Sequence, residues 1–142
     1  MKSQPWSWKR IDLPAGAFDK EATRFEAGFF EEALRFSPGD LEVLIALGSA
    51  YSRLGNVQKS LEVDLLLVKA RPDEPVFHYN LACSYSLTGQ LDCAFDSLVN
   101  AIRLGYADVE HLTMDRDLDN LKRDGRFREI IAKLQPHFNT EA

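Results

Sequence analysis

The sequence resembles itself when it is shifted by 34 residues, and no other feature limits the possible folds so strongly. Residues 41–74 align with residues 75–108, and tyrosine, leucine, glycine and small residues recur at matching places. A period of about 34 residues is typical of a unit made of two helices joined by a turn. Because such a unit cannot bury its apolar side alone, successive units must stack into an all-α solenoid. The matched pairs are Leu47 with Leu81, Gly48 with Ala82, Tyr51 with Tyr85, Ser52 with Ser86, Gly55 with Gly89 and Ser60 with Ala94.

The pattern within each unit predicts a first helix and the turn that ends it. Leu44, Leu47 and Tyr51 recur at helical spacing, so they form one face of a first helix. Gly55 and Gly89 each follow such a segment, and glycine readily adopts the left-handed conformation that closes a helix. Each 34-residue unit is therefore expected to contain a helix, a glycine turn and a second helix.

The second helices carry apolar stripes, and Pro72 stops the first of them because proline cannot continue a helix. Asp64 interrupts this stripe, and a buried carboxylate needs a partner. Two alternatives follow: Asp64 pairs with His78 at the junction of the two units, or the helix rotates slightly and the carboxylate reaches water. The predicted stripes are Leu61, Leu65 and Val68 in one unit, and Ala94, Leu98, Ala101 and Ile102 in the next.

Taken together, these residues resemble the tetratricopeptide repeat (TPR) family. The first copy is Leu44-x-x-Leu47-Gly48-x-x-Tyr51 followed by Gly55, Ser60 and Pro72, and the second is His78-x-x-Leu81-Ala82-x-x-Tyr85 with Gly89 and Ala94. The resemblance covers about half of the chain. It implies antiparallel helix pairs stacked into a superhelix whose concave face binds another polypeptide.

The segments that flank the two repeats complete a single expected TPR domain over residues 19–142, preceded by an irregular arm over residues 1–18. Residues 21–36 read as one helix with an apolar stripe, which resembles the second helix of a preceding repeat. Pro14 and Gly16 interrupt the place of its first helix, so a leading half-repeat is expected to cap the stack. The expected parts are the half-repeat 19–40, the repeats 41–74 and 75–108, and a helical cap 109–138. The stripe of the half-repeat consists of Phe25, Phe29, Ala33 and Phe36.

Short helices are expected within the cap, over residues 108–112, 118–122 and 126–134. Its apolar faces come from Leu118, Leu121, Phe127, Ile130, Ile131 and Leu134. From His111 to Phe127 the sequence is similar to an ending that closes the last repeat in many bacterial TPR proteins, and this favours a bacterial source.

Charge and composition exclude several classes of partner. The chain has 142 residues and a formal net charge of -5, so a broad basic field for nucleic acid or an anionic membrane is not expected. No apolar run approaches the roughly 20 residues that a membrane-spanning helix needs. The first eight residues are not followed by an apolar run, so no signal peptide is predicted, and the expected compartment is the cytoplasm.

No motif for catalysis, a metal or a cofactor is recognisable. Asp115, Asp117 and Asp119 open like a calcium loop, but Asn120 and Arg126 stand where such a loop needs glycine and glutamate. Helix capping explains these aspartates better. The two cysteines lack metal-ligand spacing, and the three histidines are scattered. We therefore expect no enzyme activity and no cofactor.

The resemblance also implies which residues face the ligand groove, because in TPR modules the inner face comes from the first helix of each pair. On this chain the groove residues would be Ile45, Ser49, Ser52, Arg53, Tyr79, Asn80, Cys83 and Ser86. The alternative is that Ile45 and Tyr79 only pack against neighbouring helices. Since Asn80 alone matches the residues with which some TPR modules clamp a carboxylate, an extended or helical segment with apolar anchors is the better fit.

The expected function is therefore protein–protein interaction, as an adaptor or scaffold element that binds a peptide or protein segment. The alternative is a self-associating unit that forms a homodimer or larger homo-oligomer. Its contact would be either the end of the solenoid or the arm, where Trp6 and Trp8 are unlikely residues to leave in water.

Overall fold

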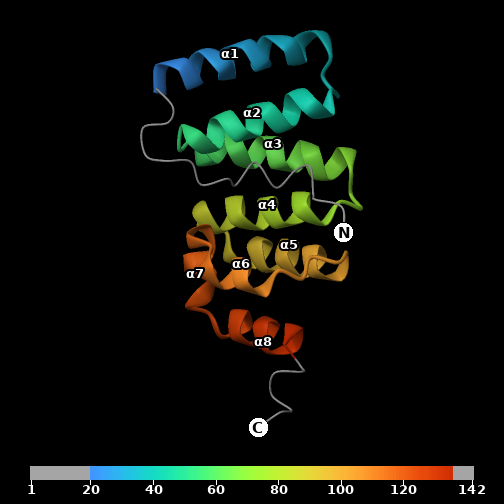
Figure 1. Cartoon of the computed structure of the whole chain (residues 1–142), viewed down its shortest axis with the longest axis vertical. Helices are drawn as coiled ribbons and strands as arrows, with labels where there is room; N and C mark the ends of the chain where they lie inside the picture. Colours follow the sequence, from blue (N-terminus) through green and yellow to red (C-terminus); the bar gives the residue numbers. More distant parts are fainter. Residues whose placement is uncertain (1–19, 136–142) are drawn as a thin grey trace. The chain divides into compact units, whose positions relative to one another are not determined.

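The computed structural model describes residues 20–135 and confirms an all-α fold over that range. The expected arm with Trp6 and Trp8, and the last residues of the expected cap, lie outside the described residues. Figure 1 shows the order of the helices along the chain. They are α1 (Lys20–Phe36), α2 (Leu41–Arg53), α3 (Val57–Ala70), α4 (Pro75–Leu87), α5 (Leu91–Arg103), α6 (Val109–Met114), the short 3-10 helix η2 (Arg116–Leu118), α7 (Asp119–Lys122) and α8 (Gly125–Leu134).

The 34-residue period of the sequence reappears in the helix boundaries. Helices α2 and α4 begin at equivalent places in the two repeats, and so do α3 and α5. The turns between them are closed by Gly55 and Gly89, whose φ angles are 70° and 77°. Residues with a Cβ rarely adopt this region, so the repeated glycines set the repeated turn. The carboxylate of Asp40 and the amide oxygen of Asn56 accept hydrogen bonds from first-turn backbone N–H groups of α2 and α3, both at 3.2 Å.

The described part of the chain forms two compact units, which divide between Pro72 and Asp73. In the first unit α2 packs against both α1 and α3, and the three helices lie side by side in Figure 1. Apolar side chains of α2 and α3 supply most of the core of this unit, and α1 adds two small buried residues. The buried residues include Leu44, Leu47 and Ala50 of α2, Leu61, Val63 and Leu67 of α3, and Thr23 and Ala27 of α1.

The stripe of α1 that was expected to pack points the other way. Phe25, Phe29 and Phe36 are 80%, 63% and 81% exposed, whereas Thr23 and Ala27 are buried. The physical reason is that small side chains let α1 approach α2 closely, while the large rings stand on the opposite side of the helix. An apolar stripe predicts that a helix face is buried, but it does not identify the element that packs against that face.

The stripe predicted for α3 is also partly wrong. Leu61 is buried, but Leu65 is 43% exposed and Asp64 is completely buried. Helix α3 is therefore rotated about its axis relative to the prediction. The alternative in which the Asp64 carboxylate reaches water is excluded. Its hydrogen-bonding capacity must be met inside the protein.

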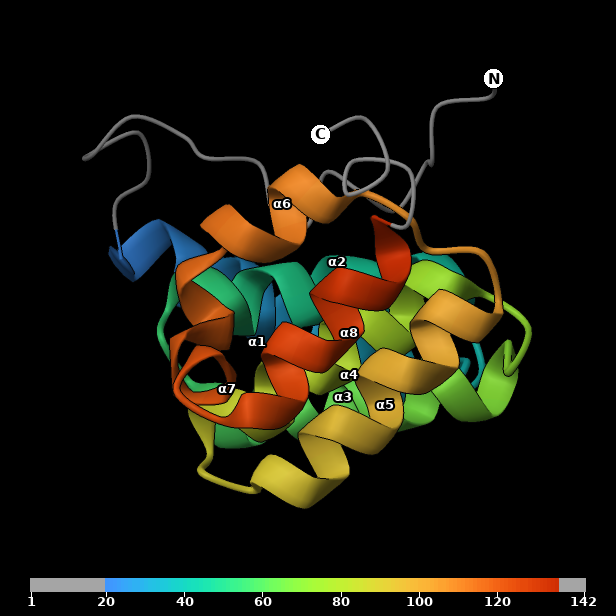
Figure 2. The same ribbon diagram turned by 90° about the horizontal axis from the view of Figure 1, so that it is seen from below.

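The second unit is built on the α4–α5 pair, and the C-terminal helices complete its core. Of the stripe predicted for α5, Ala94, Leu98 and Ala101 are fully buried, and Ile102 is partly buried against the same core. Figure 2 shows α8 beside α5, and Arg126 at the start of α8 links the two. Its guanidinium lies 4.2 Å from the centre of the Phe95 ring and 2.8 Å from Asp92. The predicted cap residues Leu118, Leu121 and Phe127 are buried in the same core.

Overpacking the α4–α5 pair should destabilise the protein. Ala82 is fully buried in the core of the second unit, and no space for three more carbon atoms is expected at such a position. We expect Ala82→Leu to lower the free energy of unfolding by about 1–3 kcal/mol. Ala132→Leu, at an exposed position of α8, is the matched control and should leave it nearly unchanged. Equal thermal midpoints for both variants would contradict the assigned packing.

Candidate functional site

The predicted groove residues divide into a buried set and a partly exposed set. On α4, Tyr79, Asn80, Cys83 and Ser86 are at most 2% exposed. On α2, Ile45 and Ser49 are also buried, at 3% and 7%, whereas Ser52 and Arg53 are partly exposed. In the first unit, therefore, only the C-terminal end of the predicted α2 face is open to solvent.

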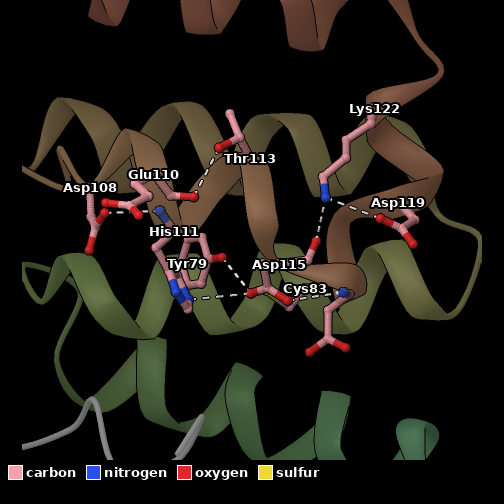
Figure 3. A network of polar contacts seen from close by, with 10 residues as sticks. Tyr79, Cys83, Asp108, Glu110, His111, Thr113, Asp115, Asp119 and Lys122 are labelled. Carbon is pink, nitrogen blue, oxygen red and sulfur yellow. Dashed lines mark hydrogen bonds and ion pairs between the residues drawn. The ribbon is translucent and has the colours of Figure 1, made fainter. Parts of the chain in front are cut away.

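The face of α4 is covered by the C-terminal part of the chain itself. Helices η2 and α7 pack against α4, and a carboxylate between α6 and η2 reaches two of the predicted groove residues. The hydroxyl of Tyr79 donates a hydrogen bond to Oδ2 of Asp115 at 2.5 Å, and the thiol of Cys83 approaches the same oxygen at 3.8 Å. Figure 3 shows these side chains converging on Asp115. This carboxylate is therefore the main polar contact between α4 and the segment that covers it.

Local sequence explains why Asp115 stands at this place. Leu112 and Leu118, three residues to either side, are fully buried and anchor the segment in the core. Between these anchors the chain changes from α6 to η2, and Oδ1 of Asp115 accepts the backbone N–H of Asp117 at 3.0 Å. The other oxygen of the carboxylate is then free to face α4. Asp115 thus caps the start of η2 and also accepts a hydrogen bond from α4.

Aromatic rings surround the same carboxylate. The rings of Tyr79 and Tyr106 stack with centroids 4.4 Å apart and planes 6° from parallel. Nε2 of His111 lies 3.4 Å from Oδ2 of Asp115. Burial, together with the negative groups nearby, raises the pKa of the Tyr79 hydroxyl far above its usual value. Tyr79 therefore stays protonated and serves as a fixed hydrogen-bond donor.

Two further polar contacts hold the segment over α4. The side-chain amide of Asn120 donates to the backbone carbonyl of Ser86 at 2.9 Å, which satisfies an acceptor in the last turn of α4. The ammonium of Lys122 donates to the backbone carbonyl of Asp115 at 2.8 Å and to Asp119 at 3.1 Å (Figure 3). The covering segment is thus bound by side chain–backbone contacts as well as by its leucines.

The cluster around Asp115 contains residue types that elsewhere hold metals or perform catalysis. Cys83, Asp115 and Asp117 offer possible metal-ligand atoms within 4.8 Å of one another. The Asp115 carboxylate already accepts hydrogen bonds from Tyr79 and from a backbone N–H group. Cys83 is fully buried, so its thiol is inaccessible to a substrate in this conformation. The arrangement is accounted for by helix capping and by the packing of the segment on α4.

The open end of the α2 face carries one ion pair with α1. The guanidinium of Arg53 lies 2.6 Å from Oε2 of Glu26, and the Arg53 side chain is 25% exposed. Arginine offers five donors in a fixed planar arrangement, so it can bind a second acceptor while it holds Glu26. Among the predicted groove residues, this side chain is the charged one that solvent reaches.

A polar pocket of about 350 Å³ lies in the first unit, between α1 residues from Lys20 to Glu31 and the turn between α2 and α3. On its wall the Tyr51 hydroxyl donates to Glu31 at 2.5 Å, and Lys59 lies 3.8 Å from the same carboxylate. Burial and the Glu31 carboxylate raise the pKa of Tyr51 above its usual value. Sequence reasoning did not identify this pocket. Its lining residues include Lys20, Arg24, Glu31, Tyr51, Asn56 and Lys59.

The role of Asp115 as the contact with α4 was likewise missed. Its capping role is visible in the sequence, because aspartate before a short helix is a common cap. The contact with Tyr79 joins residues 36 positions apart, and no local pattern specifies it. The two flanking leucines were the available signal, since an aspartate between two buried anchors must itself lie near the core.

Comparisons with known proteins give two relatives of low similarity. No protein-family model matches the chain. It is 30% identical over 98 residues to a chloroplastic protein of Arabidopsis thaliana, which is 67% of this chain and 29% of that protein. It is 27% identical over 90 residues to Superkiller protein 3 of Saccharomyces cerevisiae, which is 63% of this chain and 6% of that protein. The chain therefore spans less than a third of the length of either relative.

Within residues 20–135 every helix is too short or too polar to cross a bilayer.

Removing the Tyr79 hydroxyl should weaken the attachment of the C-terminal segment. Hydrogen bonds to charged groups contribute about 1.5–3 kcal/mol, so we expect Tyr79→Phe to lower the free energy of unfolding by that amount. Tyr85→Phe is the matched control, because Tyr85 is half-buried on the same helix and its hydroxyl makes no hydrogen bond within residues 20–135. Denaturation of Tyr79→Phe, Asp115→Asn and the double variant should show coupling between the two sites. Additive effects would contradict the assigned contact.

Calcium should not bind at Asp115, Asp117 and Asp119. Arg126, at the position where a calcium loop needs a bidentate glutamate, binds Asp124 and Asp92 instead. Isothermal titration calorimetry with calcium should give no heat of binding at micromolar concentrations. A binding signal that disappears in Asp115→Ala would overturn this expectation.

Proposed function

We propose that this protein is a protein-interaction module, an adaptor or scaffold element that binds a segment of another polypeptide on the exposed faces of its first helices. The proposal rests on the repeated helix pairs and on the way in which the second unit already accommodates a polypeptide. No catalytic role is part of it, and no nucleic acid or membrane partner is proposed.

The observation that carries the proposal is the occupation of the α4 face by residues 112–122 of the same chain. This segment meets α4 through buried leucines, a carboxylate on the Tyr79 hydroxyl and an amide on a backbone carbonyl. Apolar anchors combined with a few directed hydrogen bonds are the usual means by which a helical groove recognises a peptide. The face of a first helix in this protein therefore has the chemistry that a peptide ligand requires.

The proposed surface for an external partner is the corresponding part of α2. Ser52 and Arg53 are partly exposed there. On α4 the counterpart of Ser52, Ser86, is buried and its backbone carbonyl accepts the amide of Asn120, while the counterpart of Arg53 is the apolar Leu87. A partner would contribute a backbone carbonyl or a carboxylate to Arg53 and an apolar side chain beside it. The expectation that Tyr79 contacts the partner would require the C-terminal segment to leave α4, and for that reason the proposal centres on Arg53.

A peptide-selection experiment tests the proposal. A random peptide library displayed on phage would be selected against the full chain, and the dissociation constant of each selected peptide would be measured by fluorescence anisotropy. We expect Arg53→Ala to weaken binding by roughly 2 kcal/mol or more, as at an interface hot spot.

Two controls separate recognition from folding. Lys69→Ala, an exposed cation on α3, should leave the dissociation constant unchanged. Glu26→Gln removes the ion pair of Arg53 but keeps the guanidinium, so it should weaken binding much less than Arg53→Ala. Equal affinity of the wild type and Arg53→Ala, with helicity intact in circular dichroism, would reject the α2 face as the site.

A further inference from the structure

Helix α1 presents a row of aromatic side chains to solvent. Phe25, Phe29 and Phe36 are 63–81% exposed, and their spacing of four and seven residues places them along one side of the helix. Together they expose on the order of 400 Å² of aromatic surface, since each such side chain can bury about 150–250 Å². A patch of this size is at the level that marks an interaction site on a monomer.

The side of α1 that faces away from α2 has a regular pattern. Ala22, Phe25, Phe29, Glu32 and Phe36 alternate at spacings of three and four residues, as in the contact seam of a two-stranded coiled coil. All five belong to the exposed or solvent-facing residues of the helix. This spacing is the one at which the side chains of one helix pack against a second helix.

The seam fits a copy of itself in antiparallel orientation. When a two-fold axis passes near residue 27, Phe25 of one helix lies against Phe29 of the other, and symmetry repeats this contact. In the same register Glu21 of each copy lies beside Arg35 of the other, which gives two opposite-charge pairs. Glu26 approaches its own counterpart, but Arg53 of the same chain, 2.6 Å away, offsets that charge.

The surroundings of the axis also permit close approach. Gly28 lies on the flank of the seam, and a Cβ placed on it would meet no atom within 4 Å. At this position two glycines face each other across the axis, so no side chain separates the two helices there. The register that pairs the aromatic rings is therefore also one in which the two helices can approach closely.

From this complementarity we propose that the protein forms a homodimer through α1, with the phenylalanine seam of one copy packed antiparallel on that of the other. The inference does not rest on the proposed ligand face on α2, although the Arg53–Glu26 ion pair borders both surfaces. A helix of 17 residues is about 25 Å long and buries less than the roughly 800 Å² per partner of a standard stable interface. The dimer is therefore a weak one, with a dissociation constant on the order of micromolar.

Sedimentation velocity of the full chain over a wide concentration range is the first test. We expect a monomer–dimer equilibrium, and Phe29→Glu should raise its dissociation constant at least about tenfold because it places a charge against the Phe25 ring of the other copy. Met114→Glu, which changes an equally exposed apolar residue of α6, should leave the dissociation constant unchanged.

A charge exchange tests the antiparallel register. Glu21→Arg places two arginines side by side at both flanks, and at low salt it should weaken the dimer about threefold to tenfold. The double variant Glu21→Arg with Arg35→Glu restores opposite charges and should restore the dissociation constant. If Glu21→Arg weakens the dimer and the double variant does not restore its dissociation constant, the antiparallel register is rejected.

Chemical cross-linking tests the same register through the proximity of the two Gly28 positions. In a Cys93→Ser background, which removes the exposed native thiol, Gly28→Cys should be joined to its counterpart by a short bis-maleimide reagent. Gln58→Cys, on the exposed side of α3, is the control and should not be cross-linked to its counterpart.

Two outcomes would overturn the proposal by revealing a different occupant of the seam. Both tryptophans of the chain lie at positions 6 and 8, so their emission reports on the segment before α1. A monomer at all concentrations, whose tryptophan emission moves to longer wavelength in Phe29→Glu, would mean that this segment covers the seam. A monomer with no such change would assign the seam to a different protein.

Discussion

A helix pair has two apolar sides, and the packing of its two helices against each other buries only one of them. The rest of this structure depends on that constraint. In the second unit the side of α4 that α5 does not bury is covered by the C-terminal segment, whose leucines belong to the same core as the α5 stripe. In the first unit α1 covers α2 with small residues and turns its large ones outward. The chain therefore closes one of its helix pairs with its own residues and leaves an aromatic surface on the other.

This difference between the units has a simple chemical origin. The C-terminal cover has fully buried leucines on either side of Asp115, so it contributes apolar area and also hydrogen-bonds the Tyr79 hydroxyl and the Ser86 carbonyl of α4. Helix α1 contributes alanine and threonine at the places where it meets α2, which permits close approach but buries little area. Three of its four phenylalanines, Phe25, Phe29 and Phe36, are 63–81% exposed, although such side chains would supply the most apolar area.

The repeat period made much of the fold predictable, since glycine turns and helix starts recur with it and the α5 stripe is buried as expected. The rotations of α1 and α3 about their own axes were not predictable in the same way. Both helices have apolar residues on more than one side, and the choice between sides depends on which neighbour fits. Asp64 illustrates this, because a carboxylate normally indicates the solvent side and here is completely buried. For the candidate site, the sequence predicted residues on α2 and α4, but the exposure of Arg53 and the covering of Tyr79 follow from contacts between distant segments.

The bond between Tyr79 and Asp115 also has a consequence for the order in which the protein is made. The donor leaves the ribosome 36 residues before the acceptor. At a synthesis rate of roughly 5–20 residues per second this interval lasts about 2–7 seconds. The pair α4–α5 can form early in that time, since its contacts are local. During the interval the nascent chain carries an uncovered α4 face with Tyr79 and Cys83 at its surface, available to chaperones or to neighbouring nascent chains before its own cover arrives.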